Sequence, residues 1–191
     1  MTFQQELSSW LPQSPTNVQS PPEINSTAPS SSKLPFPNPN GKPTIITFLR
    51  HCGCPFAEKT LLALRNLATT HPTLNLIAIS HSSSTSTTTW LSSLGGSGPV
   101  QIIIDPEREI YAQWGLGTSS AWHVLNPRSM LSVFRLGREE KIWNRPTESG
   151  SRWQMSGSWV VDGEGIVKGG GVARSADDIM DFEEVVKLVE L

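Results

Sequence analysis

Residues 50–59 have the sequence RHCGCPFAEK and hold both cysteines of the 191-residue chain, Cys52 and Cys54. The apolar run over residues 45–49 that precedes them predicts a buried strand. Leucine and alanine then recur at helical spacing over residues 56–68, which predicts a helix. The cysteines are therefore expected where a strand turns into a helix, and this pair of elements begins an alternating α/β pattern.

Cys54 is expected at the N-terminal end of that helix. Proline suits the first helical position, where its missing N–H costs nothing, so Pro55 makes Cys54 the cap residue. Free backbone N–H groups and the positive end of the helix dipole favour an anion at this point, and a thiolate is such an anion. The pattern therefore predicts a reactive thiol at Cys54. The alternative is that Cys52 and Cys54 are small buried hydrophobic residues, as free cysteines often are.

The composition excludes several classes of protein. A formal net charge of −2 and a pI near 6.1 argue against a nucleic-acid partner. No apolar run approaches the roughly 18 residues needed to span a membrane, and the first ten residues lack the basic and apolar regions of a secretory signal. Two cysteines one residue apart do not make a disulfide scaffold. We therefore expect a cytoplasmic protein without a nucleic-acid or membrane partner.

Residues 1–43 differ from the rest of the chain. They hold nine of the 15 prolines, many Ser, Thr and Asn residues, and only four charged residues. Such a composition cannot build a core of its own, so we predict an extended or partly disordered N-terminal arm over 1–43 and one domain over 44–191. Within the arm, residues 1–11 are a candidate short helix. Leu34 and Phe36 are expected to lie on the domain.

The rest of the chain alternates between strands and helices. Further strands are predicted at residues 74–79, 100–104, 158–161 and 166–168, the last two joined by a hairpin turn. Helices are predicted at residues 88–94, from a cap at Asp105 to Trp114, and from a capping box at Ser175 to the C-terminal end.

The segment between the third strand and the hairpin is the least periodic. Residues 122–125 are predicted as a short strand, residues 129–135 as a helical turn or a strand, and residues 137–155 as a long ordered loop, a feature that is often functional. Early strands separated by helices imply parallel crossovers, and the late hairpin adds antiparallel neighbours. The predicted fold class is therefore α/β, with a mixed central sheet covered by helices on both faces.

This order, with a cysteine at the end of the first strand–helix turn, resembles the thioredoxin fold. Three segments resemble its peroxiredoxin-like branch of the AhpC/TSA type: residues 44–59 around the cysteines, IDPEREIYAQWG at 104–115, and the hairpin GSWVVDGEGIV at 157–167. The segments WHVL at 122–125 and NRPTESGSRW at 144–153 are similar to those of chains from filamentous fungi, some of which lie near secondary-metabolite pathways.

The resemblance implies a thiol-dependent oxidoreductase in which Cys54 attacks a peroxide and becomes a sulfenic acid. Cys52, or an external thiol such as glutathione or thioredoxin, is then expected to resolve it. The family's Pro, Thr and Arg positions are occupied here by Thr47, His51 and Ser156. We expect His51 and Arg152 to orient the substrate in their place.

A second cysteine does not follow Cys54 at the spacing of a Cys-x-x-Cys dithiol, because that position is Ala57. Cys52 is the one internal thiol that is available, and a Cys-x-Cys disulfide closes a small, strained and easily reduced ring.

Further residues are predicted to contact the substrate. They are Arg50, Pro55, Phe56, Trp122, His123, Trp143, Arg145, Glu148 and Trp153. Arg145, Glu148 and Arg152 are candidates for an anion-binding group, with a surface ion network as the alternative. His123 is a candidate for either a site residue or a structural histidine.

Two other functions stay open at this point. The tryptophans at 122, 143 and 153 are typical of a pocket for a bulky organic metabolite, and so favour a tailoring enzyme of secondary metabolism. The third alternative is a non-catalytic interaction or redox-sensor module.

A metal site is the weakest of the candidates. His51 and the two cysteines form only one short cluster, with His81 or His123 as distant additions, whereas zinc takes four ligands. We therefore predict no metal and no cofactor. The expected partners are a small-molecule substrate, an external thiol reductant and, as an assembly, a homodimer.

Overall fold

The computed structural model describes residues 9–10, 17–125, 127–146 and 149–189. The strands are β1 (Thr44–Phe48), β2 (Asn75–Ser80), β3 (Gln101–Ile104), β4 (Gly157–Val161) and β5 (Val167–Val172). The labelled helices are α2 (Pro55–Thr70), α3 (Ser84–Ser93), α4 (Glu109–Gln113), α5 (Ala121–Leu125), α6 (Pro127–Glu140) and α7 (Phe182–Val186). The predicted strands and the hairpin are therefore confirmed, except the one predicted at residues 122–125.

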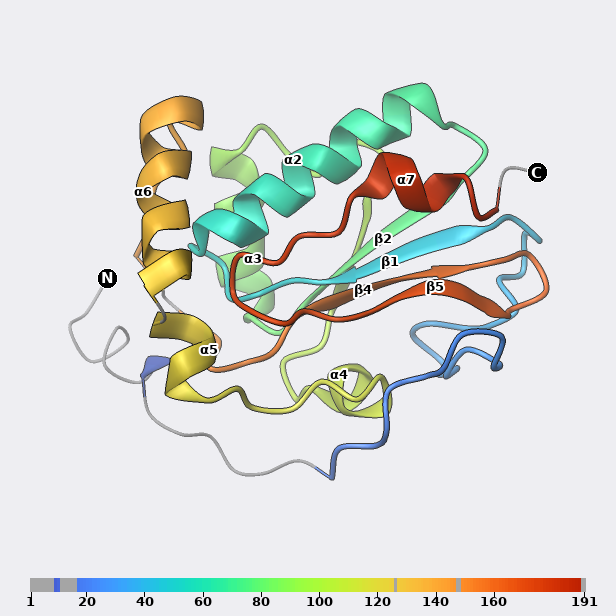
Figure 1. Cartoon of the computed structure of the whole chain (residues 1–191). Helices are drawn as coiled ribbons and strands as arrows, with labels where there is room; N and C mark the ends of the chain where they lie inside the picture. The colour runs from blue at the N-terminus through green and yellow to red at the C-terminus, as the bar shows by residue number, and fades with distance from the viewer. Residues whose placement is uncertain (1–8, 11–16, 126, 147–148, 190–191) are drawn as a thin grey trace.

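The five strands form one mixed sheet in the order β3-β2-β1-β4-β5 (Figure 1). The pairs β1–β2 and β2–β3 are parallel, and β4 pairs antiparallel with both β1 and β5. In the hairpin turn, Asp162 Oδ1 accepts hydrogen bonds from the backbone N–H groups of Glu164 (3.0 Å) and Ile166 (2.8 Å). The α/β fold with a mixed sheet is thus confirmed.

Two hydrophobic cores lie on the two faces of this sheet. On one face Ile45 packs with α2, with Trp90 of α3 and with buried residues of α6 and α7. On the other face Ile46 and Phe48 pack against Tyr111 and the N-terminal arm. Because side chains alternate across a strand, β1 contributes to both cores and is buried throughout. Figure 1 shows α2 and α7 above the sheet and α4 below it, so helices cover both faces as predicted.

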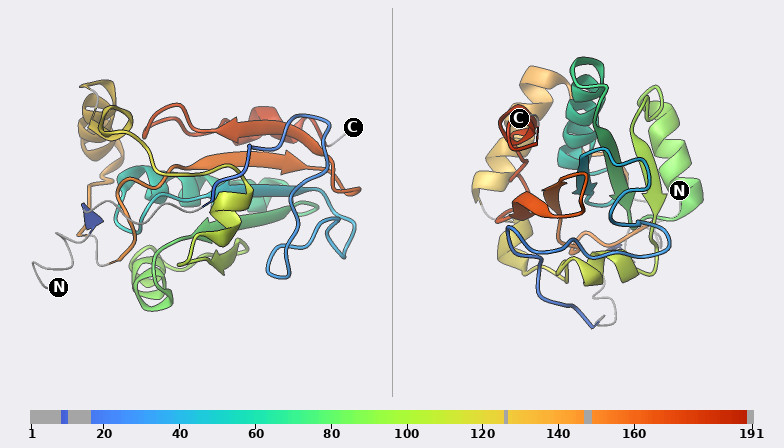
Figure 2. Two further views of the ribbon diagram at one scale, coloured as in Figure 1. Left: turned by 90° about the horizontal axis from the view of Figure 1, so that it is seen from below. Right: turned by 90° about the vertical axis from the view of Figure 1, so that its right-hand side faces the viewer.

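The described part of the N-terminal arm packs on the α4 side of the sheet (Figure 2). Leu34 and Phe36 are buried in that core, as predicted from the sequence. Thr27 forms a β-bridge with Ile166, next to a backbone hydrogen bond from Ala28 N to Gly165 O (2.9 Å). The arm therefore contributes to the core that it covers. Most of the candidate helix at 1–11 lies outside the described residues.

The strand predicted at residues 122–125 is wrong, because these residues form helix α5. Ser120 caps the turn: its carbonyl oxygen accepts from His123 N at 3.1 Å, and its hydroxyl at 3.3 Å. A run of four apolar residues has no periodicity that separates a strand from a helix. Residues 127–140 form α6, so the helical alternative predicted for residues 129–135 is confirmed. Because α6 ends only at Glu140, the loop predicted over residues 137–155 is shorter than expected.

Helix α4 begins later than predicted, at Glu109 instead of Pro106. Arg108 has a left-handed backbone (φ 60°), which separates the turn after Asp105 from the helix. Asp105 lies four residues before the start of α4 but still caps it. Its carboxylate accepts hydrogen bonds from the backbone N–H groups of Glu109, Ile110 and Tyr111 at 2.8–3.2 Å.

Helix α7 begins at Phe182 rather than at the predicted capping box over 175–178. Its N-cap is Asp181, which accepts from Glu184 N at 3.3 Å. Asp177 instead accepts from the hydroxyls of Ser129 (2.6 Å) and Ser132 (2.7 Å), so its carboxylate ties this segment to α6. In the part of the chain that the structure describes, no helix is long and apolar enough to cross a membrane.

Candidate functional site

The cysteine turn joins the end of β1 to the start of α2. Cys54 is the N-cap of α2, with extended backbone angles (φ −71°, ψ 128°) and Pro55 in the first turn, as predicted. Gly53 has φ +100°, and Cys54 N donates to His51 O at 3.1 Å to close the turn. Both cysteines are free thiols and both are buried. The positive end of α2 thus lies at Cys54, the arrangement that stabilises an anion.

Cys52 faces a group of hydroxyls from β2 and α3. The Cys52 thiol donates to Thr87 Oγ1, which lies 3.6 Å from Sγ, and Ser80 Oγ lies 3.7 Å from the same sulfur. The Cys52 N–H donates to Ser82 Oγ at 3.1 Å. The thiol also lines a cavity of about 160 Å³ together with Trp90. Its surroundings are therefore more polar than those of an inert core cysteine.

The loop after α6 covers this turn. Arg145 N donates to Gly53 O at 2.8 Å, and a side chain at position 53 would meet the carbonyl oxygens of Arg145 and Pro146. The Arg145 guanidinium pairs with Glu58 in the first turn of α2. The predicted partner Glu148 lies outside the described residues. Arg145 is thus near the thiols, with its charge balanced at least in part by Glu58.

Arg50 and His51 lie buried between β1 and the loop that leads to β4. Arg50 Nη2 donates to the backbone oxygen of Arg152 at 2.8 Å. Burial, together with the positive charges of Arg50 and Arg152, holds the pKa of His51 well below its usual value. Burial likewise lowers the pKa of His81 to about 4, with Arg108 and Arg50 adding to the effect. Both imidazoles are therefore neutral at pH 7.

The side chain of Arg152 turns toward the N-terminal arm. Its Nε donates to Ser9 Oγ at 3.1 Å, and its guanidinium carbon lies 4.9 Å from the ring centroid of Trp10. Trp153 also contacts Trp10, with ring centroids 5.7 Å apart. The backbone of Arg152 therefore touches Arg50, while its side chain holds residues of the arm, and its predicted role in orienting the substrate stays a prediction.

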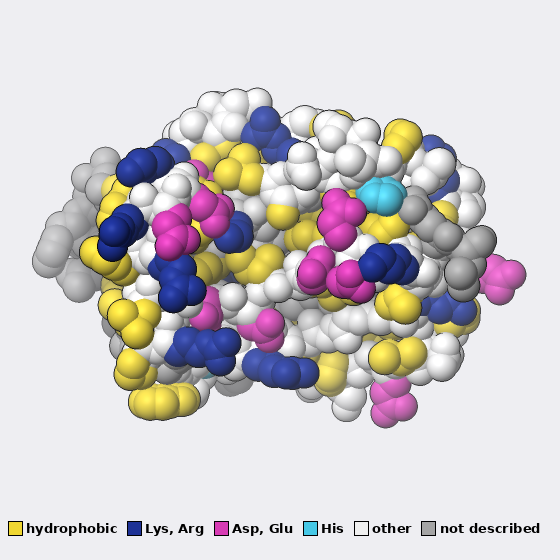
Figure 3. All heavy atoms as spheres, turned by 45° about the horizontal axis from the view of Figure 1, so that its top comes forward, with side chains coloured by type: hydrophobic (Ala, Val, Ile, Leu, Met, Phe, Trp, Pro, Cys, Tyr) yellow, Lys and Arg dark blue, Asp and Glu magenta, His cyan; other side chains and the backbone are white. Residues whose placement is uncertain are grey.

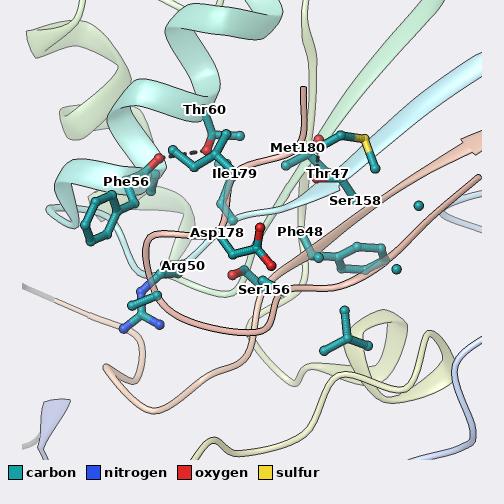
Figure 4. A pocket seen from close by; sticks show the side chains of 18 of the residues that line it. Thr47, Phe48, Arg50, Phe56, Thr60, Ser156, Ser158, Asp178, Ile179 and Met180 are labelled. Atoms are coloured by element: carbon teal, nitrogen blue, oxygen red, sulfur yellow. Dashed lines mark hydrogen bonds between the residues drawn. The ribbon is translucent and has the colours of Figure 1, made fainter. Parts of the chain in front are cut away.

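A larger cavity, of about 330 Å³, opens beside the first turns of α2 (Figure 4). Arg50, Phe56 and Thr47 line it, and so does Ser156 just before β4. Thr47 Oγ1 accepts a hydrogen bond from Ser158 Oγ at 3.2 Å. The resemblance places the family's arginine at position 156, which is a serine here, and Arg50, which follows β1, lines the same cavity.

The three tryptophans predicted to line a metabolite pocket are not brought together around one cavity. Trp122 is 73% exposed on α5, and Trp143 is 50% exposed and packs on Phe134 of α6. None of the three lines either cavity described above. In Figure 3, hydrophobic side chains gather at the α6 end of the molecule among lysine and arginine side chains. The sequence showed that these residues are large and apolar, but not that Trp122 and Trp143 face outward.

His123 lies in α5 and is half-buried. Burial and the charge of Arg50 lower its pKa, and the nearby carboxylates of Asp177 and Asp178 oppose this effect. Its backbone oxygen accepts from Ala176 N at 3.2 Å, so it contacts the segment that follows β5. Within the described ranges, no three His, Cys, Asp or Glu side chains are grouped to hold a metal ion.

Sequence reasoning missed Glu58 and Ser80 as neighbours of the cysteine turn. Glu58 lies one helical turn after Cys54, where a carboxylate near a helix N-terminus is a usual stabilising residue and gives no special signal. Ser80 at the end of β2 is brought to Cys52 only by the parallel pairing of β1 with β2. Its position at the carboxyl end of a strand beside β1 was the one available clue.

Comparison with known proteins places the fold in a defined group. The family model of the AhpC/TSA antioxidant enzymes matches residues 63–168, which begin after both cysteines. The thiol peroxidase of Chromobacterium violaceum has a similar structure: its TM-score is 0.61 at 16% identity, over 90% of this chain and 88% of that chain. A peroxiredoxin-like protein of Aquifex aeolicus gives 0.60 at 12% identity, over 91% and 89% of the two chains.

A third similar structure is a yeast mitochondrial 1-Cys peroxiredoxin described with a thiol-resolving mechanism via the glutathione and thioredoxin systems. Its TM-score is 0.55 at 14% identity, over 87% of this chain and 74% of that chain. A comparison with curated proteins found no match. At these identities the likeness establishes the thioredoxin-like fold. The chemistry has to be inferred from the residues of the site itself.

Proposed function

Because the chain belongs to the AhpC/TSA antioxidant enzyme family, we propose that it is a thiol-dependent peroxidase with Cys54 as its nucleophile. The observation that carries this proposal is the position of Cys54. Its thiol stands at the N-cap of a 16-residue helix and makes no side-chain capping hydrogen bond, and Pro55 follows it. The helix dipole and the free N–H groups of the first turn favour the thiolate, which is the nucleophilic form.

The proposed reaction begins with attack of the Cys54 thiolate on one oxygen of a peroxide. An S–O bond forms as the O–O bond breaks, and the second oxygen leaves as an alcohol or as water once it has taken a proton. The peroxide is reduced and the sulfur is oxidised to a sulfenic acid. A second thiol then attacks the sulfenic sulfur and releases water to give a disulfide, which a further thiol reduces.

Two sources of that second thiol are proposed. Cys52 is the internal candidate, since it is a free thiol two residues away and has hydroxyl groups around its sulfur. Glutathione or thioredoxin is the external candidate, because the similar yeast 1-Cys peroxiredoxin is described with those systems. A Cys52–Cys54 disulfide closes a small ring, so we expect it to be reduced easily.

Neighbouring residues are proposed to hold the peroxide. A preorganised positive group stabilises the charge that develops as an O–O bond breaks. Arg50 is buried at the end of β1 and lines the cavity beside α2, and the neutral imidazole of His51 lies next to it in sequence. We assign both to substrate orientation, with Arg152 supporting Arg50 through its backbone oxygen.

The test is intact mass spectrometry after one equivalent of hydrogen peroxide, with and without a sulfenic-acid trap. The proteins are wild type, Cys54→Ser and Cys52→Ser. We expect a trapped adduct in wild type and in Cys52→Ser, and none in Cys54→Ser. A loss of about 2 Da that requires both cysteines identifies Cys52 as the resolving thiol. Full adduct formation and peroxide turnover in Cys54→Ser would contradict the proposal.

A further inference from the structure

Helix α6 presents apolar side chains to solvent. Met130 and Leu131 lie four and three residues before Phe134, so the three residues lie on one side of the helix. Their exposed fractions are 54%, 69% and 60%. The other side of α6 packs on the domain, since Ser129 and Leu136 are buried. Single exposed apolar residues are ordinary in soluble proteins, but a group of them on one helix side indicates an interaction surface.

Trp143 extends this group. It follows α6 in the chain, and its ring packs edge-on against Phe134, with the two ring centroids 6.4 Å apart. Gly137 makes room for the ring, because a Cβ at position 137 would lie 2.5 Å from it. Trp143 nevertheless stays half-exposed. The fold thus seats a tryptophan on α6 without covering it, and we call Met130, Leu131, Phe134 and Trp143 the α6 apolar face.

Basic side chains border the α6 apolar face. Residues 127–143 include four basic and two acidic residues, which gives a local charge of +2 in a chain of net charge −2. The four basic residues are all exposed: Arg128, Arg135, Arg138 and Lys141. Among the described residues no ion pair involves the three arginines, whereas Glu140 is paired with Lys59 of α2. Figure 3 shows lysine and arginine side chains among the hydrophobic ones at this end of the molecule.

The α6 apolar face is a ridge and not a groove. None of its four side chains lines the cavity at Cys52, the cavity beside α2 or the hollow between α2 and α6. A helical peptide partner needs a groove for its apolar side chains. A second copy docked through the same face would bring the arginines of both copies together, and like charges repel. A lipid surface, in contrast, deforms around a ridge and supplies negative charge.

We propose that the α6 apolar face docks the protein on a membrane surface that contains anionic phospholipid, with α6 lying along that surface. Leu131, Phe134 and Trp143 enter the boundary between headgroups and acyl chains, and Arg135 and Arg138 contact the negatively charged headgroups. Such attachment needs no spanning helix. The net charge of the whole chain predicts no membrane partner, because it averages over the local positive charge of this one face.

The first experiment is co-sedimentation of the full-length protein with lipid vesicles. One set is phosphatidylcholine alone, and the other contains about 30% phosphatidylserine. We expect at least about tenfold tighter binding to the vesicles with phosphatidylserine at low salt. Raising the salt from about 0.05 M to about 0.5 M should weaken this binding at least about tenfold, because salt screens the arginine charges. Docking involves no thiol chemistry, so a failed peroxidase test leaves the result unaffected.

A variant then tests the apolar contribution. Leu131→Glu should weaken binding to phosphatidylserine vesicles at least about tenfold, because it places a negative charge where an apolar side chain enters the lipid. The matched control is Ile24→Glu, which makes the same change of charge at a residue that is 60% exposed on the arm. The control should change the vesicle affinity less than about twofold, since its residue lies away from α6.

A second pair of variants tests the positive charges. Arg135→Gln combined with Arg138→Gln should weaken vesicle binding at least about tenfold, since each basic residue near an anionic surface adds to the attraction. Lys33→Gln combined with Lys42→Gln removes two exposed lysines of the arm and changes the net charge equally. This control should change the affinity less than about twofold, because only charges within a Debye length of the surface contribute.

Several outcomes overturn the proposal. Wild-type protein that does not bind phosphatidylserine vesicles excludes the membrane surface. Equal losses of affinity in an α6 variant and its control exclude the α6 apolar face as the contact. If Leu131→Glu does not fold, Phe134→Glu takes its place, and vesicle binding by that variant at the wild-type affinity has the same meaning. A wild-type dimer that Leu131→Glu converts to a monomer, without vesicle binding, makes the face an interface between two copies.

Discussion

The Arg145 guanidinium binds the Glu58 carboxylate through two contacts across 87 residues of sequence, with Nε to Oε2 at 2.9 Å and Nη2 to Oε1 at 3.3 Å. The Glu58 side chain is 7% exposed and lies one turn after Cys54. The pair therefore attaches the loop after α6 to the helix that carries the candidate nucleophile. It also covers the side of the turn where Gly53 accepts from Arg145 N.

Arg145→Ala should destabilise the protein, because it leaves Glu58 charged, buried and without its partner. We expect a loss of roughly 1–3 kcal/mol in the free energy of unfolding, measured in urea. The control is Lys59→Ala, which breaks an exposed ion pair between Lys59 of α2 and Glu140 of α6 and should cost less than about 0.5 kcal/mol. Equal losses of unfolding free energy in the two variants would show that the Arg145–Glu58 pair stabilises the protein no more than an exposed ion pair does.

Gly53→Ala should disrupt the cysteine turn. The position has φ +100°, and an added Cβ would lie 2.8 Å from the carbonyl oxygens of Arg145 and Pro146. Gly41→Ala is the matched control, since Gly41 also has positive φ (+68°) but open space around it. We expect Gly41→Ala to cost about 1–2 kcal/mol for backbone strain alone, and Gly53→Ala at least about 2 kcal/mol more. Urea unfolding of both proteins measures the difference, and equal costs would argue against close contact between loop and turn.

Acid should destabilise the folded protein through His81. Its Nε2 accepts from Ser151 N at 3.1 Å, and its pKa in the folded state is about 4 against 6.5 for an unperturbed histidine. Well above pH 6.5, His81 is neutral in both the folded and the unfolded state, so its protonation costs the folded protein no stability. As the pH falls toward 4, the unfolded state binds a proton that the folded state does not, so stability is lost.

At pH 5 this effect of His81 amounts to roughly 2 kcal/mol. The measurement compares the free energy of unfolding at pH 7 and pH 5 for wild type and for His81→Gln, whose amide can still accept from Ser151. The variant should lose less stability than wild type over this interval, because glutamine does not titrate. The lowered pKa of His51 acts in the same direction and remains in both proteins. If the free energy of unfolding depended on pH identically in the two proteins, His81 would be excluded as a cause of the acid destabilisation.

Leu34→Ala should show that the N-terminal arm belongs to the folded unit. Leu34 is fully buried in the core on the α4 side, whereas Ile24 of the same arm is exposed. We expect a loss of about 2–5 kcal/mol for Leu34→Ala, and a change within about 0.5 kcal/mol for Ile24→Ala. Thermal or urea unfolding measures both, and a neutral Leu34→Ala would mean that the arm does not contribute to the core in solution.

Local sequence signals determined the elements that begin with clear chemistry. Pro55 after Cys54 marked the start of α2, and short apolar runs located all five strands to within a few residues. Leu34 and Phe36 were recognisable as core residues of the arm because they are large apolar side chains within a polar segment. These features depend on residues that are close together in the sequence, and they can therefore be predicted from a local sequence pattern.

Only the tertiary structure decided which distant groups meet at the site. The bond from Arg145 to Glu58, the hydroxyls of Ser80 and Thr87 at Cys52, and the incomplete hydrogen bonding of Arg50 all depend on contacts between elements remote in the chain. The outward position of Trp122 likewise follows from the packing of α5, which no run of four apolar residues specifies. Burial and charge balance are properties of the assembled core, because each depends on what the whole fold places around a side chain.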